Sequence, residues 1–143
     1  MKSRRALVLL SVLLAAPSAA QTDLRLIPQP REMHVEGSVS LPNGLTVARP
    51  ASAEDRFAAL DLANALKERG IRVVTGDAGP GPRVVLLRAD ASTAKSLLRR
   101  HSLTLDPAMK EEGYVIIPDG NRLVVIGTTS AGVFYGAQTV KQI

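Results

Sequence analysis

The sequence predicts an α+β fold in which helices pack on a mixed β-sheet. Three observations point to this class. Ser52–Arg69 and the stretch that follows Thr129 have apolar residues at helical spacing, and several short β-branched runs are bounded by glycine and proline. A hairpin signal joins the last two of these runs. The resulting order of strand, helix, strand, strand, helix, hairpin and helix differs from the strict alternation of a doubly wound fold.

The first predicted elements are two short strands. Pro28 and Pro30 restrict the chain ahead of them to an extended path without helix. The strands are predicted at Met33–Val35 and at Leu45–Ala48. Three residues that favour turns separate them, namely Pro42, Asn43 and Gly44.

The strongest helix prediction is Ser52–Arg69. Ser52 followed three residues later by Asp55 has the pattern of a capping box at the start of a helix. One face of this helix carries apolar residues at helical spacing, namely Ala59, Leu62, Ala63 and Leu66. We expect Gly70 to end the helix with a positive φ, and Ile71 beyond it to fold back on the apolar face.

The middle of the chain predicts two strands and a second helix. The strands are Ile71–Thr75 and Arg83–Arg88, and the stretch Gly76–Pro82 between them is rich in glycine and proline, which is typical of a surface loop. The second helix is predicted at Ser92–Arg100. Pro107 marks an irregular approach to the next element.

The last part of the domain predicts a hairpin and a closing helix. Strands at Tyr114–Ile117 and Arg122–Ile126 flank the turn Pro118–Asn121, in which Gly and Asn tolerate positive φ. Thr129 or Ser130 can cap the helix that follows. Its buried stripe is expected to contain Val133, Gly136, Ala137 and Val140. The small residues in that stripe would allow the helix to approach the sheet closely.

The first twenty residues predict a cleavable secretory signal peptide. Three basic residues precede an apolar run from Ala6 to Ala16, which a small-residue site, Ser18-Ala19-Ala20, follows. An N-terminal membrane anchor is the alternative, but a run of eleven residues spans only about half of the roughly 30 Å hydrocarbon layer. We therefore expect cleavage after Ala20 and a periplasmic or secreted mature chain. Residues 21–143 would form one domain without membrane contact.

Composition argues against several classes of function. Three of the 18 basic residues lie in the predicted signal, so the remainder carries 15 basic against 13 acidic side chains. These charges are interleaved and aromatic residues are scarce, so no nucleic-acid partner is predicted. The chain has no cysteine, which excludes disulfides, thiolate zinc sites and cysteine nucleophiles.

The two histidines and the glycine-rich closing segment do not predict a ligand site. His34 and His101 have no partner at ligand spacing, and a metal site needs three or four converging ligands. Gly127–Gly136 holds three glycines, but their spacing matches neither a dinucleotide-binding nor a Walker motif. Phe134 and Tyr135 are too few for a sugar-stacking platform, so we expect both to pack in the core. No cofactor or metal is predicted.

Neighbouring carboxylates do not predict a catalytic pair. Glu54 and Asp55 fall in the first turn of a predicted helix, where negative charge is favoured by the helix dipole. Glu111 and Glu112 precede a strand and are expected to be solvated. Adjacent residues point in different directions, whereas glycoside hydrolysis requires a facing pair. No Gly-x-Ser-x-Gly elbow is present either, so no catalytic residue is predicted.

Several segments resemble the N-terminal domain of exported glycoside hydrolases of family 20, the β-N-acetylhexosaminidases. The opening Ile-Pro-Gln-Pro-Arg-Glu at Ile27–Glu32 is similar to the Pro-x-Pro start of that domain. Glu112-Gly113-Tyr114 resembles its hairpin entry, and Ala131–Ile143 its closing helix. The closing segment is the specific part. A closely similar domain occurs in family 84 enzymes, and the resemblance covers Leu24 to Ile143.

The resemblance implies a zincin-like α+β domain that is not itself catalytic. In such enzymes the domain packs beside a (β/α)8 barrel, normally in the same chain, and the barrel carries the Asp-Glu pair of a His-x-Gly-Gly-Asp-Glu motif. That motif is absent here, so no catalytic residue carries over. We expect an accessory domain that scaffolds a barrel not present in these 143 residues. A free-standing periplasmic binding or interaction domain is the alternative.

Overall fold

The computed structural model describes residues 25–27, 29–34 and 40–143. The predicted signal peptide, residues 1–20 with cleavage after Ala20, lies outside the described residues, so it stays a prediction. In the part of the chain that is described, no helix has the length and apolar character needed to cross a membrane.

Within the described residues five strands form one sheet, and this sheet is mixed, as the sequence predicts. The strands are β1 (Leu45–Val47), β2 (Val73–Thr75), β3 (Arg83–Arg88), β4 (Tyr114–Asp119) and β5 (Arg122–Gly127). Their order across the sheet is β2-β1-β3-β5-β4. The first four in this order are parallel, and only β4 runs antiparallel to its neighbour. The carboxyl ends of β1, β3 and β5 therefore lie at the same edge of the sheet.

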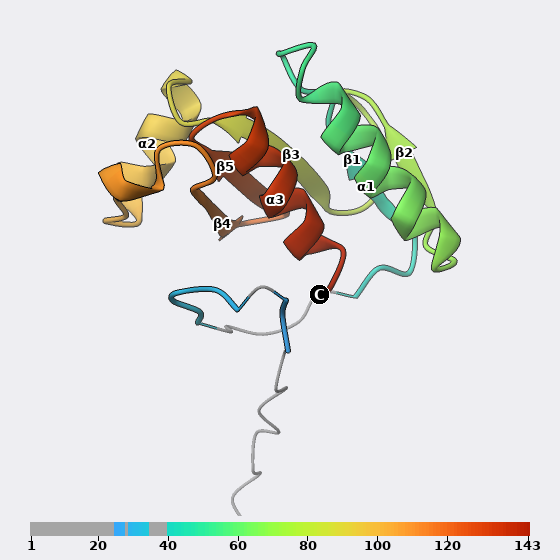
Figure 1. The fold of residues 1–143 in the computed structure, drawn as a ribbon. Helices are drawn as coiled ribbons and strands as arrows, with labels where there is room; N and C mark the ends of the chain where they lie inside the picture. Colours follow the sequence, from blue (N-terminus) through green and yellow to red (C-terminus); the bar gives the residue numbers. More distant parts are fainter. Residues whose placement is uncertain (1–24, 28, 35–39) are drawn as a thin grey trace, which may run out of the picture.

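The two faces of this sheet are covered by the three helices of the described part of the chain. They are α1 (Arg56–Glu68), α2 (Ser92–Arg100) and α3 (Ser130–Val140), and a single 3-10 turn, η1, spans Pro107–Met109. In Figure 1, α1 and α3 run side by side over one face, and α2 lies at the β4 end of the sheet. The bounds of α2 and β3 match the sequence prediction residue for residue.

Alternate residues of the central strands build two separate cores. Val84 and Leu86 of β3 pack with Val125 of β5 under α1 and α3. Val85 and Leu87 point to the other face, where the second core contains the buried residues of α2. This alternation follows from the two-residue period of a strand. The sheet is thus covered on both faces, and α1 and α3 share one core.

The close approach of α3 to the sheet depends on glycine. A Cβ at Gly136 would lie 2.4 Å from Cγ1 of Val125, and one at Gly132 would lie 2.4 Å from the carbonyl oxygen of Gly113. Real Cβ atoms do not approach so closely, so α3 could not seat at this depth with larger residues. The predicted stripe is confirmed, because Val133, Ala137 and Val140 are also buried.

The C-terminal end of α1 is a Schellman motif. Gly70 has φ +81°, its N–H donates to the carbonyl of Lys67 at 2.9 Å, and the N–H of Ile71 donates to Leu66 at 3.1 Å. These two bonds satisfy carbonyls that the helix end leaves free. Ile71 packs against the first core, as predicted. Because its N–H serves this motif, β2 begins at Val73 rather than at Ile71.

Two predictions about the first half of the domain are wrong. Met33 and His34 are not in a strand, because they pair with no edge of the sheet, and Val35 lies outside the described residues. The first helix begins at Arg56, not at Ser52. The Ser52 hydroxyl accepts a bond from the N–H of Glu54 at 3.2 Å, so the capping box does not form.

The hairpin is confirmed, but its loop is shorter than predicted. Pro118 and Asp119 belong to β4, and Asp119 pairs directly with Arg122. Gly120 alone supplies the positive φ, at +60°. Since β4 is an edge strand of the sheet, a proline is tolerated within it. At the other end of the hairpin, Thr129 caps α3 by accepting from the N–H of Gly132, which resolves the choice between Thr129 and Ser130.

Replacing Gly70 by alanine should destabilise the domain through the backbone alone. A Cβ at this position would meet no atom within 4 Å, so the only cost is the left-handed φ, about 1 kcal/mol. Urea denaturation of Gly70→Ala measures this loss. Glu68→Ala, at the exposed last turn of the same helix, is the control; an unchanged midpoint for Gly70→Ala would contradict the argument.

Candidate functional site

A buried carboxylate organises the carboxyl edge of the sheet. Asp55 precedes α1, and its side chain is only 3% exposed. Both of its oxygens accept bonds from Nε of Arg88 at the end of β3, at 2.7 and 3.0 Å. Its Oδ1 also accepts a bond from the hydroxyl of Ser130, at the start of α3, at 2.9 Å. One side chain thus joins three elements that are far apart in the sequence.

Arg88 is held by two carboxylates of different exposure. Its second contact is with the carboxylate of Glu54, at 2.9 Å, which is mostly exposed. The hydrogen bond to Asp55 raises the pKa of the Arg88 guanidinium above its ordinary value, and partial burial opposes that shift. An ion pair whose carboxylate is buried and whose partners are all hydrogen-bonded keeps its geometry. The Asp55–Arg88–Ser130 network therefore fixes the positions of the start of α1, the end of β3 and the start of α3 relative to one another.

Two open hollows flank this network. One, of about 380 Å³, lies between the network and the chain that leaves β3, and Asp90 and Ala91 line it. The other, of about 300 Å³, lies between the first turns of α1 and α3, and both hollows include Glu54. We call the second the aromatic groove, because Phe57, Phe134 and Tyr135 line it.

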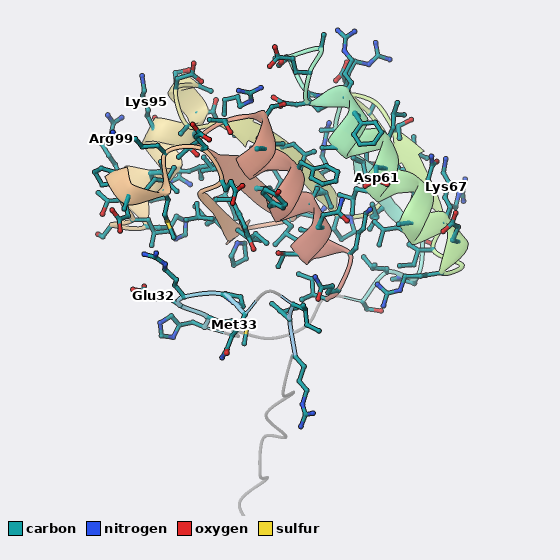
Figure 2. The ribbon with its side chains drawn as sticks, in the orientation of Figure 1. Glu32, Met33, Asp61, Lys67, Lys95 and Arg99 are labelled. Carbon is teal, nitrogen blue, oxygen red and sulfur yellow. The ribbon has the colours of Figure 1, made fainter. Side chains whose placement is uncertain are left out.

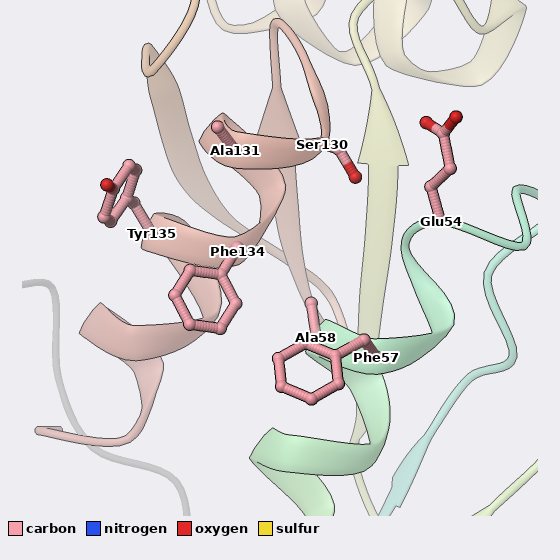
Figure 3. Close-up of a pocket in the computed structure, with 7 residues that line it drawn as sticks. All are labelled: Glu54, Phe57, Ala58, Ser130, Ala131, Phe134 and Tyr135. Carbon is pink, nitrogen blue, oxygen red and sulfur yellow. The ribbon is translucent and has the colours of Figure 1, made fainter.

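The aromatic groove collects three of the four aromatic side chains of the protein. The ring centroids of Phe57 and Phe134 are 6.0 Å apart with an interplanar angle of 23°, and Tyr135 meets Phe134 edge-on at 5.9 Å. Figure 3 shows the rings of Phe57 and Phe134 side by side, one from each helix. Phe57 is 67% exposed and Tyr135 is 41% exposed. Phe134 packs against the first core, but the prediction that Tyr135 packs in the core is wrong, because it occupies the outer side of α3.

Polar contacts also join α1 to the C-terminal end of α3, away from the groove. Asp61, which Figure 2 shows on the side of α1 that faces α3, accepts bonds from Lys141 and, at 2.8 Å, from Gln138. The bond from Lys141 is the main reason that the pKa of Asp61 lies below its ordinary value, although burial opposes it. Arg69 donates to the backbone carbonyl of Lys141 as well. The two helices therefore form one layer.

The residues weighed as candidates in the sequence do not come together. His34 and His101 are both exposed, and they lie in different places, the first in the N-terminal segment and the second directly after α2. Glu111 and Glu112 are exposed, as predicted. Among the described residues, no group of three or more histidine or acidic side chains is arranged to hold a metal.

The network and the groove do not form a facing acid and base. The hydroxyl of Ser130 donates to a carboxylate that already neutralises Arg88, so it is not activated as a nucleophile. Glu54, the exposed carboxylate of the groove, is also paired with Arg88. What the arrangement offers is a rigid, partly apolar outer surface on the α1–α3 layer, and aromatic side chains of that kind are typical of interfaces.

Comparison with known proteins identifies the family of this chain. The sequence model of the family described as glycosyl hydrolase family 20, domain 2, matches residues 23–143. The chain belongs to this family. The match supports the resemblance seen in the opening, hairpin and closing segments, and it covers the whole described fold. No curated protein sequence matches the chain.

Solved structures share the fold of this family 20 domain. CpGH84D aligns with a TM-score of 0.63 and 15% identity, over 85% of this chain and 21% of its own. CpGH84B aligns with a TM-score of 0.60 and 24% identity, over 84% of this chain and 20% of its own. The chain thus spans about a fifth of the length of these two GH84 structures. The α+β fold expected from the resemblance is confirmed.

Replacing Arg88 by methionine should be strongly destabilising. The substitution keeps the apolar stem but leaves the buried Asp55 carboxylate without its counter-charge, which typically costs about 3 kcal/mol or more. Arg31→Met is the matched control, because the Arg31–Asp106 pair is exposed and 3.5 Å long, so its loss should cost less than about 1 kcal/mol. Equal denaturation midpoints for the two variants would contradict the role of the network.

The lowered pKa of Asp61 predicts a contribution to acid stability. A carboxylate whose pKa is lower when folded stabilises the fold above its unfolded pKa, about 3.9, and this contribution is lost as the pH falls through the folded pKa. Asp61→Asn should therefore lower the free energy of unfolding at pH 7, and the deficit should shrink below about pH 4. Urea titrations from pH 3 to 7 measure it, with Glu68→Gln as the control for removing one acidic group from α1.

Proposed function

We propose that this chain is the exported, non-catalytic accessory domain of a β-N-acetylhexosaminidase-like glycoside hydrolase. Its role is to pack against a catalytic (β/α)8 barrel that follows it in a longer polypeptide. The family match supports the class of enzyme, and the partial coverage of the GH84 structures supports a larger protein. The predicted signal peptide supports passage to the periplasm or the exterior.

The observation that carries this proposal is the apolar outer surface of the α1–α3 layer. Phe57 and Leu60 project outward from α1, and Tyr135 projects outward from α3, although both helices already bury an apolar face in the core. A helix with apolar residues on both sides is expected where two surfaces cover it. Since the sheet covers the inner side, a second body is needed on the outer side.

The fixed geometry of this surface suits permanent packing rather than transient capture. Asp61, Gln138 and Lys141 hold the two helices together, and the Asp55 network holds their first turns. A surface that is rigid before contact loses little conformational entropy on docking. The aromatic groove would receive an apolar ridge of the barrel, with Phe57 and Tyr135 as its central contacts.

The coding sequence beyond Ile143 gives a direct test. It should continue into a barrel with the acidic His-x-Gly-Gly-Asp-Glu motif. A stop codon there would contradict the proposal and favour a free-standing binding domain.

Phe57→Asp should separate this domain from its partner without unfolding it. In the mature chain alone, a side chain that is 67% exposed can be replaced with little loss of stability. In the longer polypeptide, the buried charge should weaken docking by about 2 kcal/mol or more, so that one cooperative unfolding transition splits into two. Calorimetry of both proteins measures this.

Leu103→Asp is the matched control, because Leu103 is also exposed but follows α2, on the other side of the sheet. It should leave the transition of the longer polypeptide intact. Splitting by both variants, or by neither, would contradict docking through the aromatic groove.

A further inference from the structure

The N-terminal segment of the domain is fastened to the C-terminal end of α3 by one side chain. The amide oxygen of Gln142 accepts the backbone N–H of Ile27 at 2.8 Å, and its amide nitrogen donates to the backbone carbonyl of Ile27 at 2.9 Å. The two bonds together imitate the pairing of two strands. We call this pair of bonds the Gln142 clasp.

The clasp fixes the backbone of Ile27, whose apolar side chain is exposed to solvent. Ile27 is 81% exposed, although both of its backbone groups are bonded and its neighbour Leu26 is buried. Ile143, directly after the clasp residue, is 52% exposed. Single exposed apolar residues are common on surfaces, but this one is fixed in position rather than free to turn inward. Contacts within the domain therefore do not explain why this apolar side chain is exposed, whereas contact with another body would.

The clasp is anchored to the same helix layer that carries the aromatic groove. Arg69 of α1 donates to the carbonyl of Lys141, and Lys141 reaches Asp61. Tyr135, Gln138 and Gln142 follow one another at helical spacing, so they lie along one side of α3 and its extension. This line runs from the groove to Ile27.

We infer that Ile27, held by the Gln142 clasp, is a second contact point for the body that covers the aromatic groove. The inference rests on the proposed function. It commits to one occupant, the catalytic domain that follows in the same polypeptide, because a chain leaving Ile143 starts beside Ile27. The occupant must present an apolar recess for an aliphatic side chain. Gln142 is a positioning residue in this arrangement, because it acts only through Ile27.

The surface that runs from the aromatic groove to Ile27 differs in polarity between its two ends and its middle. The aromatic rings of the groove and the side chain of Ile27 are apolar, whereas the ion pair of Asp61 and Lys141 occupies the middle. Two apolar contacts on either side of a charged centre define one orientation of a docked body, since sliding or rotation would place an apolar group against the charges. The clasp would therefore fix how the two domains are oriented, in addition to holding them together.

The test uses the longer polypeptide and the mature chain side by side. Ile27→Ala should lower the denaturation midpoint of the longer polypeptide and leave that of the mature chain unchanged. Gln142→Ala should do the same, and it should also speed amide exchange at Ile27 in the mature chain by tenfold or more. In the Gln142→Ala background, Ile27→Ala should cause no further shift, because the side chain is no longer positioned.

Met33→Ala is the matched control. Met33 is exposed in the same N-terminal segment but is not a clasp residue, so its replacement should shift neither midpoint. Gln142→Glu keeps the acceptor for the Ile27 N–H but loses the donor, so it should give an intermediate shift.

The outcomes separate this inference from the proposed function. If Phe57→Asp splits the unfolding transition but Ile27→Ala shifts nothing, the clasp inference is overturned and the docking proposal stands. If Ile27→Ala lowers both midpoints equally, Ile27 acts within the domain and the inference is again overturned. If neither Phe57→Asp nor Ile27→Ala affects the longer polypeptide, the docking proposal falls as well.

Discussion

The buried charge of Asp55 is the constraint on which the arrangement of this domain depends. A carboxylate removed from water must be met by protein groups, and here Arg88 and Ser130 meet it from two different elements. This requirement fixes where α1 begins, how β3 ends and where α3 enters. The aromatic groove is built from the first turns of the two helices that the network joins. The proposed interface therefore depends on a polar contact whose carboxylate is buried.

Local signals were sufficient for much of the fold. The bounds of β3 and α2, the positive φ of Gly70 and the glycine-dependent seating of α3 all follow from residues that are near one another in sequence. The start of α1 could not be predicted in this way. Ser52 and Asp55 form a valid capping pattern, but Arg88, 33 residues farther on, competes for the Asp55 carboxylate. A long-range ion pair overrides a local cap.

The candidate site was harder to predict because the strongest periodicity in α1 marks only its buried face. Phe57 and Leu60, three residues apart, lie on the outer side of this helix, and these two large apolar residues outside the buried stripe were the available signal. The prediction for Tyr135 fails for a related reason, since an aromatic residue in an apolar helix normally packs inward. Under the proposed function, a domain that is covered on its outer side would depart from that rule at the residues that contact the covering body.

The Gln142 clasp also has a topological consequence. It brings the first and last described parts of the domain within hydrogen-bonding distance, so the described chain starts and finishes at the same point of the fold. Domains with adjacent ends tolerate circular permutation, because a short linker can join the old ends while new ones are opened elsewhere. The exposed hairpin loop at Gly120 and Asn121 is such a place. The same adjacency would let the domain be inserted as one unit into a loop of another protein, with little separation imposed on the two halves of its host.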